Sequence, residues 1–292
     1  AIADEAGIPL IVDNTLASPF LCRPIEMGAT LVVHSLTKYL TGNGTVTGGA
    51  VIDSGKFDWS ASDKFPSLSA PEPAYHGLKF HETFGAAAFT FHGIAIGLRD
   101  LGMTLNPQAA HYTLMGIETL GLRMQRHVEN AQTVAEWLAA DSRVLEVSYA
   151  GLPASPWNER VQRLYPKGAG ALFTVQLKGG YDACVRFIGA LKLFSHVANL
   201  GDARSLAIHS ASTTHRQLTG DQQVAAGAGP DVVRLSIGLE DPADLIADLD
   251  QALAAGATSA RSSVAAATRS CRGPTKRSTI SGVNAPASLA AR

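Results

Sequence analysis

At residues 34–38 the chain reads His-Ser-Leu-Thr-Lys, directly after the apolar run Ala-Thr-Leu-Val-Val at 29–33. A short apolar run rich in β-branched residues predicts a buried strand, so Lys38 follows the end of that strand. A lysine amine can condense with an aldehyde cofactor, and the nearby hydroxyls of Ser35 and Thr37 can reach a phosphate group on the same molecule. The glycine-rich segment 42–49 that follows is compatible with a phosphate-binding loop.

A carboxylate follows a second short apolar run upstream, where Ile11-Val12-Asp13-Asn14-Thr15 places Asp13 at the end of a predicted strand. Pyridoxal phosphate needs both a lysine and an acid that keeps its pyridine nitrogen protonated, because the protonated ring withdraws electrons. Each feature alone has a simpler explanation: a solvated surface lysine, an aspartate in a turn or helix cap, and glycines in tight turns. Their joint occurrence, each after a predicted strand, favours a site for this cofactor.

Several motifs together resemble the Cys/Met-metabolism family of pyridoxal-phosphate enzymes, which has fold type I: V-D-N-T followed by S-P, then H-S-x-T-K-Y and a glycine-rich loop ending in G-G. The resemblance runs from residue 1 to about residue 254. It implies that Asp13 pairs with the pyridine nitrogen and that Ser35 and Thr37 bind the phosphate. It also implies that Lys38 bonds covalently to the cofactor and is the catalytic acid and base.

The implied fold class is α/β, the C-terminal part of a fold-type-I transferase with a mostly parallel sheet in its large domain and a smaller α+β C-terminal domain. We expect the cofactor-binding part at 1–106, the substrate-side domain at 107–256, and a disordered tail at 257–292 that carries six basic and no acidic residues. Residues 1–7 resemble the end of a helix that leads into a strand. We therefore expect a chain that is truncated at its N-terminus relative to the family and lacks some of its phosphate contacts.

Hydrophobic periodicity predicts the remaining elements. Parallel-type buried strands are expected at 29–34 and 46–53, and a long ordered loop at 55–78. Asn106-Pro107 is expected to start one long helix that reaches about residue 139. The second domain is expected to contain strands near 143–149, 170–177, 194–199 and 231–237, and helices near 156–164, 181–192 and 242–254.

Arg234 lies within the apolar strand Val232-Val-Arg-Leu-Ser236, where a guanidinium needs an anion. That anion could be a carboxylate of the chain or the α-carboxylate of an amino-acid substrate, which an arginine can hold through two parallel hydrogen bonds. The resemblance implies the substrate carboxylate, and it makes Asn199 a second substrate-binding residue. Asn199 and the insertion at 55–78 both favour the sulfhydrylase branch of the family.

The resemblance implies replacement of the acetyloxy group of O-acetyl-L-homoserine by sulfide or a thiol, which yields homocysteine or methionine and acetate. Two alternatives stay open: a cystathionine γ-synthase or γ-lyase of the same family, and a non-catalytic fragment with an incomplete cofactor site. Family members assemble as dimers of dimers, so a homo-oligomer is expected.

Composition narrows the possible partners and compartments. Hydrophobic residues make up 46% of the chain and charged residues 17%, which is typical of a compact enzyme. The cysteines are odd in number and widely spaced, at Cys22, Cys184 and Cys271, which favours a reducing compartment, so a cytoplasmic enzyme is expected. The acidic body does not favour nucleic acid, no apolar run is long enough for a membrane span, and the histidines lack the spacing of a metal site.

Overall fold

The computed structural model describes residues 2–257 of the chain. The predicted tail lies outside the described residues, except for its first residue, Ala257. Within residues 2–257 no helix combines the length and the apolar character that a bilayer crossing requires.

The predicted cofactor site lies on a three-stranded sheet of β1 (Ile11–Asp13), β2 (Leu31–Ser35) and β3 (Gly49–Asp53), in that order. β1 runs parallel to β2, as predicted, with Asp13 beside Val33. β3 runs antiparallel to β2, so the parallel pairing expected for 46–53 is wrong. The reason is local: the Leu36 amide donates to the Gly48 carbonyl at 2.9 Å, so β3 begins beside the end of β2.

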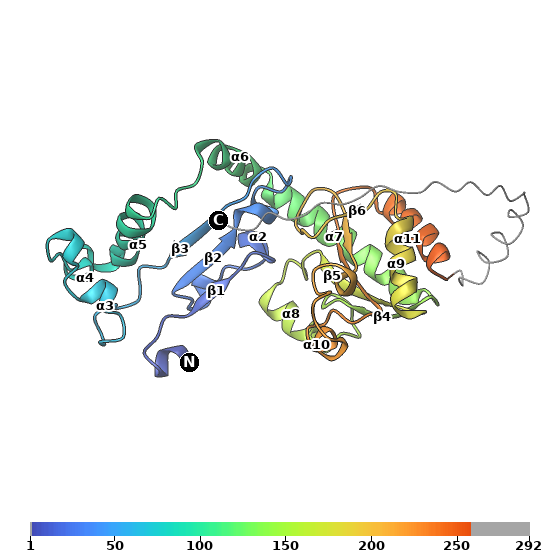
Figure 1. Ribbon diagram of the computed structural model, residues 1–292, viewed down its shortest axis with the longest axis horizontal. Coiled ribbons are helices and arrows are strands. Elements are labelled where there is room, and N and C mark those ends of the chain that lie inside the picture. The colour runs from blue at the N-terminus through green and yellow to red at the C-terminus, as the bar shows by residue number, and fades with distance from the viewer. Residues whose placement is uncertain (1, 258–292) are drawn as a thin grey trace, which may run out of the picture. The chain divides into compact units, whose positions relative to one another are not determined.

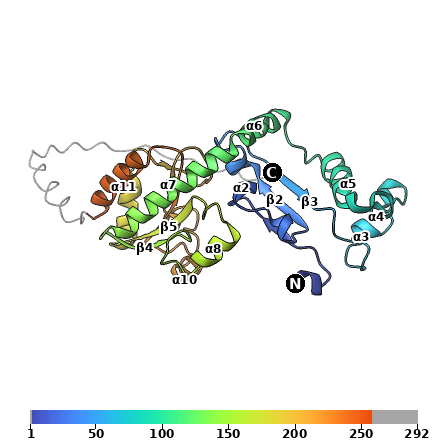
Figure 2. The same ribbon diagram turned by 180° about the vertical axis from the view of Figure 1, so that it is seen from behind.

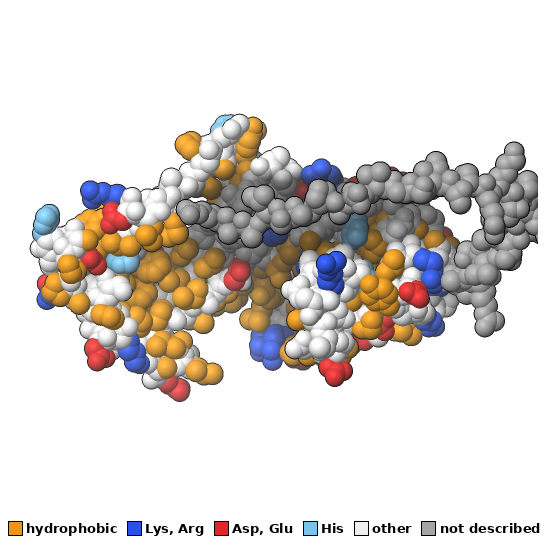
Figure 3. Space-filling view, in the orientation of Figure 1, with side chains coloured by type: hydrophobic (Ala, Val, Ile, Leu, Met, Phe, Trp, Pro, Cys, Tyr) orange, Lys and Arg blue, Asp and Glu red, His pale blue; other side chains and the backbone are white. Residues whose placement is uncertain are grey.

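Two of these strands are more exposed than their apolar sequences predict. Ile11 in β1 is 56% exposed and Val51 in β3 is also 56% exposed, whereas Leu31 in β2 is buried. Hydrophobic side chains gather over this part of the molecule (Figure 3). Apolar strands are usually covered by another part of a protein or by a partner. Among the described residues, however, no strand pairs with the outer edge of β1 or β3.

The segment after β3 is ordered, as predicted, and includes short helices. Its aromatic core is centred on Trp59 and Phe80, which are 4% and 1% exposed. Trp59 stacks on Phe89, with 5.4 Å between ring centroids, and so ties the loop to the following helices. The short helices of the first 100 residues are α1 (Ile2–Glu5), α2 (Ser18–Leu21), η1 (Pro24–Met27), η2 (Leu36–Leu40), α3 (Pro66–Ser69), η3 (Pro73–Tyr75), α4 (Phe80–Phe84), η4 (Gly85–Ala87), α5 (Ala88–His92) and η5 (Gly93–Asp100).

The expected long helix begins at Pro107 but is divided into α6 (Pro107–Glu118) and α7 (Leu120–Ala140), which follow each other in Figure 1 and Figure 2. The side chain of Asn106 caps α6 by accepting hydrogen bonds from the amides of the next turn. The break at Thr119 was not predicted. It arises because the Gly116 carbonyl accepts from the Thr119 amide at 3.3 Å and from the Arg123 guanidinium at 2.6 Å instead of continuing the helix.

The second sheet has the order β4-β5-β8-β7-β6 and confirms the predicted alternation of strands and helices. β7 and α10 were not predicted, because elements of three and six residues give too little periodicity. α9 and α11 lie side by side in both ribbon views and pack on this sheet around a common apolar core (Figure 1). The elements are β4 (Val144–Ser148), α8 (Asn158–Leu164), β5 (Leu172–Leu177), α9 (Gly180–Ala190), β6 (Ser195–His196), β7 (Leu206–Ile208), η6 (Ser210–Ser212), α10 (Gly220–Ala225), β8 (Val232–Ser236) and α11 (Pro242–Ala257).

A substitution of Leu249 in α11 tests the packing of this core. Its side chain is fully buried, so Leu249→Ala is expected to lower the free energy of unfolding by about 2–5 kcal/mol through lost burial and the cavity left behind. The matched control is Leu145→Ala, because Leu145 is 54% exposed and should change stability little. Urea unfolding followed by circular dichroism measures both. Equal midpoints for the two variants would contradict the burial of Leu249 in this core.

Candidate active site

Lys38 lies in η2, the helical turn that directly follows β2. Leu36 and Tyr39, on either side of Lys38, are 6% and 1% exposed and anchor the turn in the core. Lys38 itself has non-helical torsions, φ −100° and ψ −136°, which bend the turn at this residue. The lysine therefore stands on a well-anchored turn and is itself only partly buried.

The structure brings Lys38, Asn199 and Arg234 together, although they are far apart in the sequence. Lys38 Nζ donates a hydrogen bond to Asn199 Oδ1. Arg234 Nη2 donates to the backbone carbonyl oxygen of the same asparagine at 3.3 Å. Burial lowers the pKa of the Lys38 amine below its usual range, and the charge of Arg234 lowers it further. A larger share of the amine is therefore uncharged, and able to accept a proton, than in an exposed lysine.

Arg234 is a cation without an acidic partner among residues 2–257. No carboxylate in this part of the chain lies within ion-pair distance of its guanidinium, and burial lowers its pKa. The structural salt bridge considered for Arg234 is therefore absent from the described residues. A half-buried guanidinium with only a backbone carbonyl as partner is suited to an external anion.

Asp13, Thr15 and Ser35 form a second group at the ends of β1 and β2. Asp13 Oδ1 accepts hydrogen bonds from Thr15 Oγ1 at 2.5 Å and from the Thr15 amide at 3.0 Å. These bonds lower the pKa of the Asp13 carboxyl, so it is ionised at neutral pH. Thr15 Oγ1 in turn accepts from the Ser35 amide at 2.8 Å. One threonine thus joins the exposed carboxylate to the end of the strand that precedes Lys38.

Thr37 contacts the glycine-rich loop. Its hydroxyl accepts from the Gly48 amide at 3.2 Å and lies 3.4 Å from the Gly48 carbonyl oxygen, to which it donates. Both Ser35 and Thr37 remain partly exposed. The two predicted phosphate ligands therefore differ. The Thr37 hydroxyl already holds the glycine-rich loop, whereas the Ser35 hydroxyl has no hydrogen bond among the described residues.

Two contributors to the site were not predicted from the sequence. Thr15 follows Asp13 by two residues, and this Asp-x-Thr spacing is the signal that could have revealed the carboxylate's partner. Gly201 lets the loop that carries Asn199 approach the lysine turn, because a Cβ at this position would lie 2.8 Å from the Tyr39 nitrogen. Gly201 also has φ +72°, which favours glycine.

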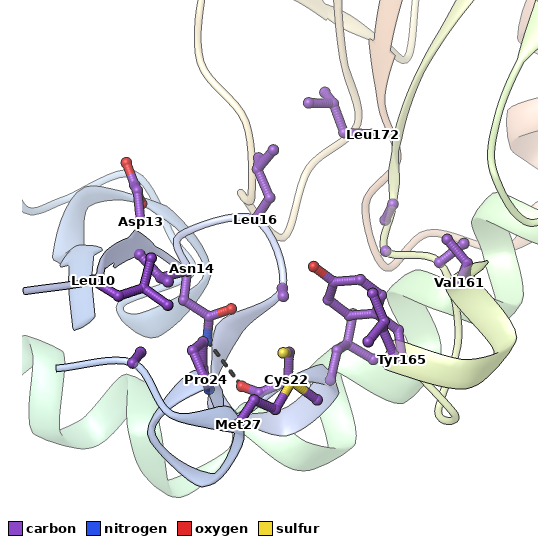
Figure 4. Close-up of a pocket in the computed structure, with 18 residues that line it drawn as sticks. Leu10, Asp13, Asn14, Leu16, Cys22, Pro24, Met27, Val161, Tyr165 and Leu172 are labelled. Carbon is purple, nitrogen blue, oxygen red and sulfur yellow. Dashed lines mark hydrogen bonds between the residues drawn. The ribbon is translucent and has the colours of Figure 1, made fainter. Parts of the chain in front are cut away.

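A separate apolar cavity of about 450 Å³ lies beside β1 (Figure 4). It is lined mainly by apolar side chains, with Cys22 and Tyr165 facing one another, and Asp13 lies at its margin. Lys38, Asn199 and Arg234 are not among its lining residues. Its walls lack converging polar groups, so we place the candidate chemistry at the Lys38 group instead. Burial raises the pKa of the Cys22 thiol, in agreement with the prediction that this cysteine is a buried apolar residue.

The side chains present fit the requirements of pyridoxal phosphate. An amine of lowered pKa stands on the turn after β2, and an ionised, exposed carboxylate stands at the end of the neighbouring parallel strand. Two partly exposed hydroxyls lie between them in the sequence. An electron-withdrawing ring needs the first two groups, and a phosphate can use the hydroxyls.

Comparisons with known proteins agree with this chemistry. The sequence model of a family described as Cys/Met metabolism PLP-dependent enzyme matches residues 1–254. O-acetyl-L-homoserine sulfhydrylase 1 of Thermus thermophilus is 50% identical over 253 residues, which cover 86% of this chain and 60% of the relative. O-acetyl-L-homoserine sulfhydrylase of Leptospira meyeri is 47% identical over 261 residues, which cover 86% and 59%. The chain thus spans about 60% of the length of these curated relatives.

Solved structures give the same assignment of fold. A Campylobacter jejuni protein assigned as an O-acetylhomoserine (thiol)-lyase matches with a TM-score of 0.82 and 39% identity, over 87% of this chain and 60% of its own. That structure contains N'-pyridoxyl-lysine-5'-monophosphate. Cystathionine gamma synthase of Xanthomonas oryzae, in complex with cystathionine, matches with a TM-score of 0.70 and 34% identity, over 87% and 57%. These similarities confirm the predicted α/β class of fold type I.

Proposed function

The chain belongs to the Cys/Met-metabolism family of PLP-dependent enzymes, and from this premise we propose that it replaces the acetyloxy group of O-acetyl-L-homoserine with sulfide or a thiol. With sulfide the products are homocysteine and acetate, and with methanethiol they are methionine and acetate. The observation that carries the proposal is that Lys38 and Arg234 both hydrogen-bond to Asn199. An amine that can move protons thus lies beside a cation that can hold a carboxylate.

Lys38 is proposed as the acid and base of the reaction. An amino acid whose α-carboxylate is held by Arg234 brings its Cα–H bond close to Lys38 Nζ, because Asn199 lies between the two cations. The lowered pKa of Lys38 makes the uncharged amine available to take the proton from Cα and to move a second proton at Cβ. Acetate leaves as its bond to Cγ breaks, and the thiol sulfur then bonds to Cγ and releases its own proton to solvent. Lys38 returns one proton to Cβ and one to Cα, so the lysine ends the cycle as it began.

Asp13, Ser35 and Thr37 are proposed to hold pyridoxal phosphate. When bound, the cofactor supplies an electron-withdrawing ring that stabilises negative charge next to Cα. Asp13 is ionised and exposed, and would accept a hydrogen bond from the protonated ring nitrogen. Ser35 and Thr37 would contribute hydroxyl groups to the phosphate. Thr15 orients Asp13 and thereby fixes its carboxylate relative to β2.

The sulfhydrylase is preferred over a cystathionine γ-synthase or γ-lyase for two reasons. The sulfhydrylase relatives are 47–50% identical, whereas the matched cystathionine synthase structure is 34% identical. Asn199, which the resemblance associates with the sulfhydrylase branch, also lies beside Lys38 and accepts its hydrogen bond.

Product analysis tests the proposal and separates the candidates. The purified chain is incubated with pyridoxal phosphate and O-acetyl-L-homoserine plus sulfide, methanethiol or cysteine, and homocysteine, methionine, cystathionine and acetate are quantified by mass spectrometry. We expect homocysteine or methionine together with an equal amount of acetate. Cystathionine formed from cysteine as the main product would favour the synthase. A folded chain that forms no product with any thiol would contradict the proposal and favour the non-catalytic alternative.

We also propose that the enzyme works in the cytoplasm as a homo-oligomer. α6 and the start of α7 expose large apolar side chains, including Leu114 at 63%, Met115 at 53% and Leu122 at 77%. Exposed apolar surface of this extent is typical of interaction sites. The two buried cysteines in the described residues are free thiols, which suits a reducing compartment.

A further inference from the structure

Arg123, at the start of α7, directs its guanidinium to the turn that carries Lys38. Nη1 donates to the Tyr39 carbonyl oxygen at 2.9 Å, and Nη2 donates to the Leu40 carbonyl oxygen at 3.4 Å. The remaining bonds go to the break between the two helices: Nη2 to the Gly116 carbonyl oxygen at 2.6 Å and Nε to Thr119 Oγ1 at 3.0 Å.

These acceptors explain why the residue is an arginine. The last carbonyls of a helical turn have no partner within the turn, and a cation near them is favourable. Arg123 satisfies carbonyls at the ends of η2 and α6 at once, which requires the several donors of a planar guanidinium. It has no carboxylate within ion-pair distance among the described residues, and burial lowers its pKa. Its bonds to neutral carbonyls are therefore its main compensation for burial.

The backbone around Arg123 is packed so closely that the turn has little freedom to move. A Cβ on Gly116 would lie 2.5 Å from the Leu40 carbonyl oxygen and would also meet the backbone of Thr41. A Cβ on Gly42 would lie 2.6 Å from the central carbon of the guanidinium. Glycines at both positions allow α6 and the lysine turn to approach Arg123 from two sides.

We propose that Arg123 is a positioning residue for Lys38. By holding the carbonyls of the two residues that follow Lys38, it fixes the bent turn that directs the amine toward Asn199 and Arg234. This inference rests on the proposed role of Lys38 in catalysis, but its test needs neither cofactor nor turnover. A failed activity assay and a failed positioning test can therefore be told apart.

The titration of Lys38 is the direct measurement. Lysines of the full chain are reductively methylated with ¹³C-formaldehyde, and the pKa of each dimethylamine is read by NMR, with Lys38→Arg used to assign the Lys38 signal. In the parent chain we expect the Lys38 pKa below that of the exposed lysines, because its amine is partly buried beside Arg234. In Arg123→Met the turn loses its support and the amine gains solvent, so its pKa rises toward the ordinary value. Each half unit of this rise reduces the uncharged fraction about threefold at a pH below both values.

Arg126→Met is the matched control, because Arg126 lies three residues along the same helix and is exposed. It should leave the Lys38 titration unchanged, while Arg123→Lys should give an intermediate pKa because it keeps the charge but loses the planar set of donors. All variants are compared at temperatures where circular dichroism shows them folded. If Arg123→Met does not fold, Arg123→Lys and Arg123→Gln decide the question. A parent-like Lys38 pKa in folded Arg123 variants would overturn the proposal.

Discussion

A chain with alanine in place of Lys38 is expected to retain its fold and to lose its proposed reaction. The Lys38 side chain is only partly buried, and its one hydrogen bond among the described residues is to Asn199 Oδ1, so its removal leaves only a neutral amide oxygen without its partner. The loss in turnover should be at least about 10²–10⁴-fold, the usual contribution of a positioned acid and base, because no other amine in the described site can move the proton. Lys38→Ala should therefore abolish turnover while leaving the melting temperature of the chain close to that of the parent.

The same variant tests the covalent bond to the cofactor. After incubation with pyridoxal phosphate and reduction with borohydride, peptide mass spectrometry should find the added phosphopyridoxyl group at Lys38 of the parent chain. It should find none at that position in Lys38→Ala. Lys56→Ala is the control, because Lys56 is exposed and distant in sequence from the site. Full turnover in Lys38→Ala, or modification of another lysine in preference to Lys38 in the parent chain, would refute the assignment.

Part of the candidate site could be located in the sequence because its residues are concentrated in short motifs. Asp13 is the last residue of β1 and Lys38 lies shortly after β2, and because β1 and β2 are parallel neighbours, their C-terminal ends meet at one edge of the sheet as expected. Asn199 and Arg234 are different, because no spacing rule connects them to Lys38. The resemblance to a family predicted that both bind the substrate, and the hydrogen bonds that join Asn199 to Lys38 and Arg234 are consistent with that prediction.

The features that escaped prediction depend on contacts between segments distant in the sequence. The break at Thr119 follows from the approach of Gly116 to the lysine turn, and the periodicity of the two helices contains no sign of that contact. The direction of β3 follows from one hydrogen bond between Leu36 and Gly48. Apolar content also cannot show what covers a strand, which is why Val51, in the strand expected to be buried at 46–53, is exposed.

Replacing Arg234 by methionine should weaken substrate binding without lowering the stability of the fold. Its guanidinium is half-buried and has no carboxylate partner among the described residues, so Arg234→Met removes a cation whose burial is compensated only by the hydrogen bond to the Asn199 carbonyl oxygen. We therefore expect the melting temperature to stay the same or to rise. If the guanidinium holds the substrate carboxylate through two charge-assisted hydrogen bonds, each contributes roughly 1.5–3 kcal/mol. Loss of both should weaken substrate binding by about 10²–10⁴-fold.

Steady-state kinetics and thermal unfolding of the same preparations distinguish the two roles of Arg234. Arg234→Lys keeps the charge but loses the planar pair of donors, so it should fall between the parent chain and Arg234→Met in KM for O-acetyl-L-homoserine. KM for sulfide should change little, because sulfide has no carboxylate. Arg160→Met is the control, because Arg160 is exposed and its guanidinium lies over the ring of Trp157 on the surface. A large fall in melting temperature with unchanged KM would show that Arg234 is structural, since a substrate-binding cation without a partner predicts the reverse.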